Sequence, residues 1–291
     1  MGQALPMVTI AMPVCNAAAT ILAAIRSMQL QTWRDWELLV IDDGSTDATV
    51  SLVAGLQDPR VRLIVGGGNR GLAARLNQAI SLSRAPLIAR MDADDIAYPA
   101  RLEAQVEFLQ REPGCDLAGC GVLIFDAVGN VTGRYPFRGS HADICRNPWR
   151  GFFLPHPTWM GRREWFLKFG YLESYLKTQD QDLLLRSFDT STFACVERTL
   201  LGYRQECRTL GKALRGRLYF SRSIVREAAA RRAWLGGIGG VAAQAGKSLV
   251  DLVTVPLGLD GWLRRGGTTI SATEREEWIT VWRACNMGGQ K

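Results

Sequence analysis

Apolar and polar positions alternate in two patterns along residues 8–111. Short runs of apolar, often β-branched residues predict buried strands. Each run precedes a segment whose apolar residues recur every three or four positions, as on one face of a helix. The predicted strands are 8–12, 37–41, 61–65 and 86–91, and the predicted helices are 20–30, 47–56, 72–83 and 99–111. This α/β alternation indicates a mainly parallel sheet with helices on both faces, and Pro13 is expected to end the first strand.

The pattern changes after Gly114. A Gly129-Asn130 turn signal separates two apolar runs, which indicates an antiparallel or mixed extension of the sheet. The expected elements are strands at 117–125, 131–137 and 193–196, helices at 163–169, 179–187 and 212–234, and a glycine-rich stretch without assignment after 234. We expect a main domain at 1–207, with halves at 1–114 and 115–207, and a basic helical extension at 208–291.

The loops after the first four strands contain most of the unusual residues of this region. They are residues 13–16, 42–47, 66–71 and 92–95. Parallel sheets bind ligands at the carboxyl ends of their strands, where such loops begin. We therefore expect a binding site along this edge.

Three carboxylates, those of Asp92, Asp94 and Asp95, follow the fourth strand. A buried strand end is an unfavourable place for three negative charges unless a cation joins them. Oxygen ligands suit Mg²⁺ or Mn²⁺, with water and a diphosphate completing the coordination. Asp92 and Asp94 would point to the same side of an extended segment. The simpler alternative is that these acids are turn residues and cap the helix after Pro99.

The second loop also begins at a strand end. Ser45 or Thr46 is expected to cap the next helix, and Asp47 suits the helix dipole in its first turn. Neither Asp42 nor Asp43 is needed for capping. A carboxylate at this place, above all that of Asp43, is suited to accept hydrogen bonds from a base or a ribose.

The third loop, Gly66 to Gly71, matches the dinucleotide fingerprint G-x-G-x-x-G and has Asp92 about 20 residues further on. It follows the third strand, however, whereas the fingerprint belongs to the first strand of a nucleotide-binding half. Two interpretations stay open: an NAD site, or a loop shaped for close backbone approach, with Arg75 and Asn77 on the next helix facing a ligand.

Three further features lie in the second half. Asp180 opens a helix that leucines anchor to the core, so it is either a general base or an N-cap. His156 is either structural or a contact to phosphate or metal. The tryptophans Trp149, Trp159 and Trp165 are expected in the core, with stacking on a sugar as the alternative.

Cysteine usage and charge narrow the setting. Seven cysteines without a C-x-x-C pair fit neither a disulfide framework nor a zinc knuckle, so a reducing cytoplasm is expected. No Lys or Arg precedes Arg26, so no signal peptide is expected, and Pro6 spoils a myristoylation pattern.

The net charge of +7 is concentrated in the tail, because residues 201–291 carry +8 and residues 1–200 carry −1. Such charge attracts phosphates of nucleic acid or of an anionic membrane. The uncharged run 234–246 has 13 residues, fewer than the ~20 that span a bilayer. We expect the tail to lie on a membrane without crossing it. An ordinary solvated helix pair is the alternative.

Together, these motifs resemble glycosyltransferase family 2, an inverting family with the GT-A fold. The matching blocks, in the family's order, are residues 9–16, 42–47, 69–77, 91–95, 156–158 and 179–182. The resemblance covers roughly residues 7 to 205. Two departures are Cys15, where the family usually has an aromatic residue, and Gln179, where it usually has Glu.

The resemblance implies a role for each matching residue. Residues 1–114 would be the donor half and 115–207 the acceptor half. The nucleotide would contact Pro13, Cys15, Asn16, Asp43, Arg75 and Asp92; the Mn²⁺ or Mg²⁺ would bind Asp94 with Asp92; and Asp180 would be the catalytic base.

The resemblance also implies a reaction. A sugar would pass with inversion from a nucleotide diphosphate, UDP being the family's commonest, to a saccharide or lipid-linked saccharide in surface polysaccharide biosynthesis. The chain would work in the cytoplasm, on the inner face of the cell membrane, without a nucleic acid partner. The alternatives are a nucleotidyltransferase, an NAD-dependent oxidoreductase using residues 66–71, or a non-enzymatic binding module using the basic tail.

Overall fold

The structure is a computed structural model that describes residues 5–205, 209–259 and 270–286. Cys207 and the expected boundary at residue 207 lie outside these ranges. The described chain forms a nine-stranded sheet in the order β3-β2-β1-β4-β8-β6-β9-β5, with β7 paired to β6. The strands are β1 Val8–Val14, β2 Trp36–Asp42, β3 Val61–Ile64, β4 Leu87–Arg90, β5 Ile96–Ala97, β6 Leu117–Phe125, β7 Val131–Arg134, β8 Met160–Arg162 and β9 Phe193–Arg204.

The first four strands are parallel, as predicted. Pro13 does not end β1, however; it lies inside the strand, in register with Ile41. Ala11 accepts a hydrogen bond from Met91 on the β4 side, and Pro13, two residues on, faces the same side. Strand β4 pairs with β1 only as far as Ala11. The missing N–H of Pro13 therefore removes no ladder bond, which is why a proline is tolerated here.

The other half of the sheet is mixed, as predicted. β8 is antiparallel to β4 and β6, and β9 runs parallel to β6. β9 is longer than the predicted strand 193–196, because it continues to Arg204. Its middle, around Glu197 and Arg198, is exposed and lies where the register with β6 shifts at Gly121. The polar residues at this irregularity interrupted the apolar pattern and hid the rest of the strand.

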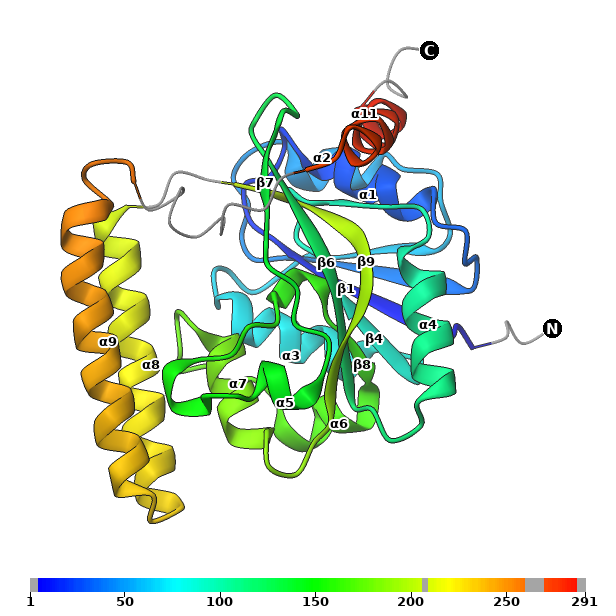
Figure 1. The fold of residues 1–291 in the computed structure, drawn as a ribbon. Coiled ribbons are helices and arrows are strands. Elements are labelled where there is room, and N and C mark those ends of the chain that lie inside the picture. Colours follow the sequence, from blue (N-terminus) through cyan, green and yellow to red (C-terminus); the bar gives the residue numbers. More distant parts are fainter. Residues whose placement is uncertain (1–4, 206–208, 260–269, 287–291) are drawn as a thin grey trace.

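Helices cover both faces of the sheet (Figure 1). Apolar side chains of β1 alternate between two cores: Ile10 and Met12 enter the core beneath α1 and α11, and Ala11 enters the one beneath α3 and α6. The helices are α1 Ile21–Gln29, α2 Thr49–Ala54, α3 Leu72–Leu82, α4 Arg101–Arg111, α5 His141–Ile144, α6 Arg163–Phe169, α7 Gln179–Ser187, α8 Leu210–Ala230, α9 Trp234–Thr254 and α11 Ala272–Asn286, with 3₁₀ turns η1 Pro148–Arg150 and η2 His156–Thr158.

The glycine-rich stretch left without assignment is helix α9. It packs beside α8 as a hairpin at one side of the molecule (Figure 1). A Cβ on Gly237 would lie 2.4 Å from that of Ala228, and one on Gly240 would lie 2.6 Å from the carbonyl oxygen of Trp149. The glycines thus permit close packing, which offsets their helix cost of about 1 kcal/mol each. Among the described residues, no helix combines the length and hydropathy needed to cross a membrane.

Helix α11 returns to the main core. Trp278 is fully buried, with its ring centroid 4.7 Å from that of Phe125, and its indole N–H donates to the Gly129 carbonyl. A Cβ on Gly202 would lie 2.2 Å from the Trp278 ring, so this glycine makes room for the indole. Residues 272–286 therefore pack into the core formed by residues before 207, although the sequence division at 207 itself stays a prediction.

Candidate active site

The loops after β1 and β2 are joined by hydrogen bonds. Asn16, whose backbone is left-handed (φ 53°), donates its N–H to the Ser45 hydroxyl and accepts the Thr46 N–H at 2.8 Å. The prediction that Ser45 or Thr46 caps the next helix was therefore wrong. Helix α2 begins at Thr49, and the Thr49 N–H donates to Asp47 at 3.0 Å.

Asp43 fastens the loop after β3. Its carboxylate accepts the backbone N–H groups of Arg70 and Gly71, at 2.7 and 2.9 Å. It also accepts the Nε–H of Arg75 at 2.8 Å. Arg75 is buried and donates through Nη2 to two carbonyls of the same loop, those of residues 66 and 68. Asp43 and Arg75 thus shape the glycine loop, and a nucleotide contact for either stays a prediction.

This arrangement bears on the dinucleotide interpretation. In a dinucleotide fingerprint, glycines let the loop backbone approach the pyrophosphate closely. Here the N–H groups of Arg70 and Gly71 both donate to the Asp43 carboxylate, so neither is available to bind a pyrophosphate. The neighbouring Asp42 is engaged in the same way, because its carboxylate accepts the N–H groups of Gly44 and Ser45.

The other residues predicted to face the nucleotide differ in exposure. Pro13 is half-buried and Cys15 is exposed. Desolvation and the nearby Asp43 carboxylate raise the pKa of the Cys15 thiol. Asn77 turns to the other half of the molecule: its side chain bonds both the N–H and the carbonyl of Tyr171, each at 2.9 Å. It therefore ties α3 to the segment that precedes α7.

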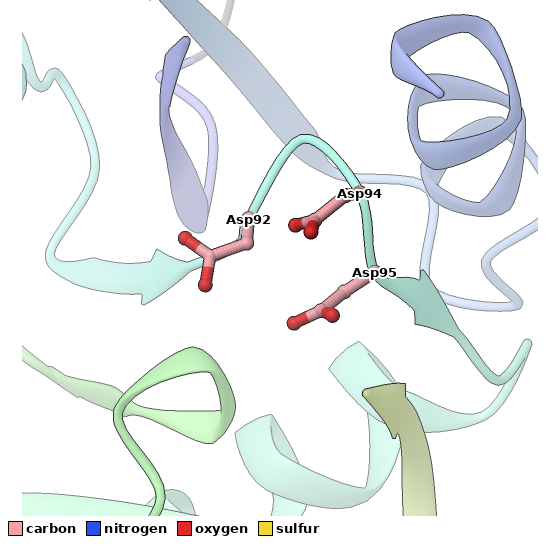
Figure 2. Close-up of side chains that lie close together, drawn as sticks. All are labelled: Asp92, Asp94 and Asp95. Carbon is pink, nitrogen blue, oxygen red and sulfur yellow. The ribbon is translucent and has the colours of Figure 1, made fainter. Parts of the chain in front are cut away.

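The three carboxylates of Asp92, Asp94 and Asp95 converge in the turn between β4 and β5 (Figure 2). One oxygen of each lies within 4.8 Å of the other two. A tight turn at positions 93–94 gathers them, rather than the alternation of an extended segment. The capping alternative was wrong, because α4 begins after Ala100 and has no side-chain cap.

Asp95 is fully buried, and only one of its oxygens is satisfied. Oδ1 accepts the Arg204 N–H at 2.9 Å, whereas Oδ2 has no partner among the described residues. Desolvation and the charges of Asp92 and Asp94 raise the pKa of Asp95 well above its ordinary value. A buried, unsatisfied oxygen in an acidic cluster is the environment that a divalent cation relieves.

Arg90, at the end of β4, is a site residue that sequence reasoning missed. Arg90 is 5% exposed and its guanidinium pairs with Asp92, yet Nε and Nη1 have no partner among the described residues. Its charge lowers the pKa of His156 and opposes the rise in the pKa of Asp180. Arg90 therefore lies between the carboxylate cluster and the second half of the site. A charge inside an apolar strand was the available signal.

Asp180 lies in the first turn of α7 and lines a cavity of about 350 Å³. The N-cap of α7 is Thr178, which bonds no helix N–H with its side chain, so the capping alternative for Asp180 was wrong. Burial raises the pKa of Asp180. The cavity walls are rich in aromatic residues. The other lining residues besides Asp180 are Tyr135, Phe152, Phe153, Leu154, Pro155, His156, Pro157, Gln181 and Tyr203. A larger hollow of about 590 Å³ lies around Met7 and Leu87, at the amino ends of β1 and β4.

His156 has a structural partner in this cavity wall. Its Nε2 lies 2.8 Å from the Tyr171 hydroxyl, and its ring packs edge-on against Trp159. Desolvation and Arg90 lower its pKa well below the ordinary value, so the ring is neutral at pH 7. Trp159 and Trp165 belong to the core, as expected, and Trp149 packs on α9.

Helix α8 supports the helix that bears Asp180. Asp182 is buried and lies in the first turn of α7, two residues after Asp180. Its carboxylate accepts hydrogen bonds from the Ser223 hydroxyl at 2.7 Å and from Arg226 Nη2 at 2.8 Å. A second cavity, of about 460 Å³, opens between α7 and the hairpin and shares Phe152, Phe153 and Gln181 with the first. Three cations line it, those of Arg150, Arg217 and Lys247.

Comparison with known proteins decides the family. Residues 9–170 match the glycosyl transferase family 2 profile, more than half of the chain. The chain belongs to glycosyltransferase family 2. The interpretations as an NAD-dependent oxidoreductase, a nucleotidyltransferase or a non-enzymatic module were therefore wrong, and the chain is a glycosyltransferase enzyme.

Individual relatives agree. The chain is 38% identical over 144 residues to the succinoglycan biosynthesis protein ExoO of Rhizobium meliloti, covering 49% of this chain and 40% of that protein. It is 39% identical over 103 residues to WfgD of Escherichia coli, named UDP-Glc:alpha-D-GlcNAc-diphosphoundecaprenol beta-1,3-glucosyltransferase, covering 35% and 41%. The matches thus span less than half the length of these two relatives.

A solved structure shares the fold. The crystal structure of S. aureus TarS 1–349 in complex with UDP-GlcNAc superimposes with a TM-score of 0.62 at 14% identity, covering 96% of this chain and 81% of that one. This family 2 enzyme therefore has the GT-A fold, as the sequence predicted.

Proposed function

We propose that this family 2 enzyme is an inverting glycosyltransferase that moves a sugar from UDP to a hydroxyl of a saccharide or lipid-linked saccharide in surface polysaccharide biosynthesis. The observation that carries the proposal is the meeting of Asp92, Asp94 and Asp95 with Arg90 at one edge of the sheet, beside the cavity that holds Asp180.

The carboxylate cluster fits a divalent cation. The three oxygens share one space, and Asp95 Oδ2 is a buried acceptor to which no described residue donates. Asp94 and Asp92 would bind Mn²⁺ or Mg²⁺, which prefer such oxygen ligands. When bound, the cation would neutralise charge on the departing diphosphate. Arg90 would add a fixed positive charge there, since two of its nitrogens lack partners in the described structure.

Asp180 would act on the acceptor. Its carboxylate lines a cavity with aromatic walls, which suit the apolar faces of a sugar ring. There it would remove the proton of the acceptor hydroxyl, which attacks the anomeric carbon from the face opposite the diphosphate. Such a base supplies roughly 10²–10⁴ of the rate, and the remainder comes from positioning and exclusion of water.

The nucleotide would lie on the loops after β1 and β2. Pro13, Cys15 and Asn16 would border the base with Asp43, with Arg75 supporting the loop beneath, and Asp92 would bind the ribose. UDP is supported by its presence in the names of WfgD and of the TarS complex. WfgD also supports a lipid-linked acceptor, met on the inner face of the cell membrane by an enzyme working from the cytoplasm.

A panel of nucleotide sugars tests the proposal. Purified protein is incubated with each donor and Mn²⁺, Mg²⁺ or EDTA, and release of the nucleoside diphosphate is measured. We expect metal-dependent release from a UDP-sugar and a metal-dependent thermal shift with UDP. Release from no donor in the panel, together with no thermal shift for any nucleotide, would refute the proposed donor class.

A further inference from the structure

The outer helix of the α8–α9 hairpin has its apolar face turned to solvent. Large apolar side chains recur every three or four positions along α9, which places them on one face. They are Leu235, Ile238, Leu249 and Val253, exposed by 90%, 67%, 66% and 59%. Ala242 and Gly246 continue the row between them and are also exposed. We call these six residues the α9 stripe.

The opposite face of α9 carries the polar and small residues. Gln244 and Asp251 are buried there, and Arg217 of α8 pairs with Asp251 at 3.0 Å. Gly237 and Gly240 provide the close contacts with α8 and the loop at Trp149. A helix on the surface of a water-soluble protein has the reverse arrangement, with its apolar face toward the core. The stripe therefore has the orientation of a surface that meets an apolar partner.

The charged side chains of the hairpin indicate the partner. Between residues 209 and 259, the two acids are Glu227 and Asp251, and both are buried in ion pairs. The exposed charged side chains of this segment are therefore all basic; they are Lys212, Arg215, Arg222 and Arg232. An apolar stripe accompanied by cations alone is the pattern of a helix that lies in the plane of an anionic membrane.

The cavities support the same partner. The cationic cavity between α7 and the hairpin joins the walls of the Asp180 cavity through Phe152 and Phe153. Arg217 is paired there with Asp251, and the other two cations, Arg150 and Lys247, suit the phosphates of a lipid-linked acceptor whose sugar reaches Asp180. A second copy of this basic hairpin would be repelled at the same surface, which disfavours a homodimer there.

We propose that the α9 stripe docks the enzyme on an anionic lipid surface, with α9 lying in the interface and α8 linking it to α7. The identity of the acceptor in this picture rests on the proposed function, whereas lipid binding does not depend on catalysis.

Vesicle sedimentation of the full chain tests the proposal. Vesicles are made of phosphatidylcholine alone or of phosphatidylcholine with phosphatidylglycerol. We expect binding to the anionic vesicles, weakened by salt, and at least roughly tenfold weaker binding for Leu235→Glu and for Val253→Glu, because each removes one apolar side chain that would enter the lipid. The matched control is Val128→Glu, which changes a residue of 72% exposure in the β6–β7 turn; it should bind as the unmodified protein does.

Two further measurements complete the experiment. Thermal unfolding confirms that the variants are folded, and donor hydrolysis, which needs no membrane, should stay unchanged in Leu235→Glu. Unaltered vesicle binding by both stripe variants would overturn the proposal. So would a dimer in light scattering that Leu235→Glu converts to a monomer, because the stripe would then be a protein interface. If the unmodified protein hydrolysed no donor, the proposed function would be refuted, and the conclusion about membrane binding would be unaffected.

Discussion

Two groups of acidic residues at the same edge of the sheet differ in how their oxygens are satisfied. Asp43 accepts two backbone N–H groups and the guanidinium of Arg75. Asp95, which is also buried, has one satisfied oxygen and one without a partner in the described structure. Its neighbours Asp92 and Asp94 add negative charge, and two nitrogens of the nearby cation Arg90 find no partner among the residues that the structure describes.

The difference separates a carboxylate that shapes a loop from a carboxylate cluster suited to bind a cation. A buried carboxylate with all its donors in the protein stabilises a loop, and its removal is felt as lost stability. A buried carboxylate without them lowers stability until something else supplies positive charge. The family resemblance assigns both groups to one donor site as a prediction. The hydrogen bonds add that the first group shapes a loop, whereas the second has the environment that suits a cation.

The largest effect is expected at Asp180, in the cavity that neither of the two compared groups lines. Asp180→Asn should reduce kcat by about 10²–10⁴, because the acceptor hydroxyl loses its base, while donor affinity is kept. Steady-state kinetics and calorimetry with UDP measure the two quantities. Glu173→Gln, an exposed site beside Arg70, is the control. Near-full turnover in Asp180→Asn would show that another group takes the proton.

Asp43→Ala should be the most destabilising change in the satisfied group. It leaves the buried guanidinium of Arg75 without its carboxylate, a loss of roughly 3–5 kcal/mol for broken buried pairs. Denaturant unfolding measures this change. Glu173→Ala, which breaks the exposed pair with Arg70, should cost no more than about 1 kcal/mol. Equal losses for the two variants would mean that Asp43 does not hold the loop.

Asp95→Asn should stabilise the protein, in contrast to Asp43→Ala. The amide keeps an acceptor for the Arg204 N–H and removes a charge beside Asp92 and Asp94, so the metal-free protein should gain roughly 1–3 kcal/mol. The thermal shift produced by Mn²⁺ with UDP should shrink at the same time. Asp189→Asn, at an exposed pair with Arg231, is the control. A destabilised Asp95→Asn protein with an undiminished metal response would contradict the distinction drawn between the two groups.

The smallest effect is one of pH. Burial raises the pKa of Asp180 above the ordinary value of about 3.9. The base acts when deprotonated, so activity should be lost as pH falls through this raised pKa, and the acid limb of kcat should lie above pH ~4. The limb should be absent from the residual activity of Asp180→Asn. A limb that persists unchanged there would belong to another group.

The sequence was sufficient for the elements whose apolar residues follow one period. The predicted helices 163–169 and 179–187 coincide with α6 and α7, and the ends of the four parallel strands differ from the predicted ends by at most two residues. It was insufficient where a distant contact overrides the local pattern. The glycines of α9 are favourable only because Ala228 and Trp149 lie against them. The continuation of β9 depends on pairing with β6 across an irregular register.

The site divides in the same way. Motifs located the carboxylates and Asp180, because acidic residues at the ends of predicted strands and helices can be recognised from the sequence alone. Arg90 and Arg204 were missed, since their roles depend on what lies across from them: Asp92 for the first, and the backbone of Asp94 with Asp95 for the second. The nucleotide, metal and base assignments themselves stay predictions.

Trp278 has a consequence for how the molecule is made. Its indole fills the space above Gly202 and meets Phe125, so one face of the sheet is completed by a residue near the far end of the chain. During synthesis the strands leave the ribosome long before Trp278 does. The apolar face beneath Trp278 stays uncovered until α11 leaves the ribosome. Its closure then requires contacts between residues far apart in the sequence, which form slowly. Premature termination before residue 272 would therefore leave a catalytic sheet with exposed core, a substrate for chaperones and proteases rather than a shortened enzyme.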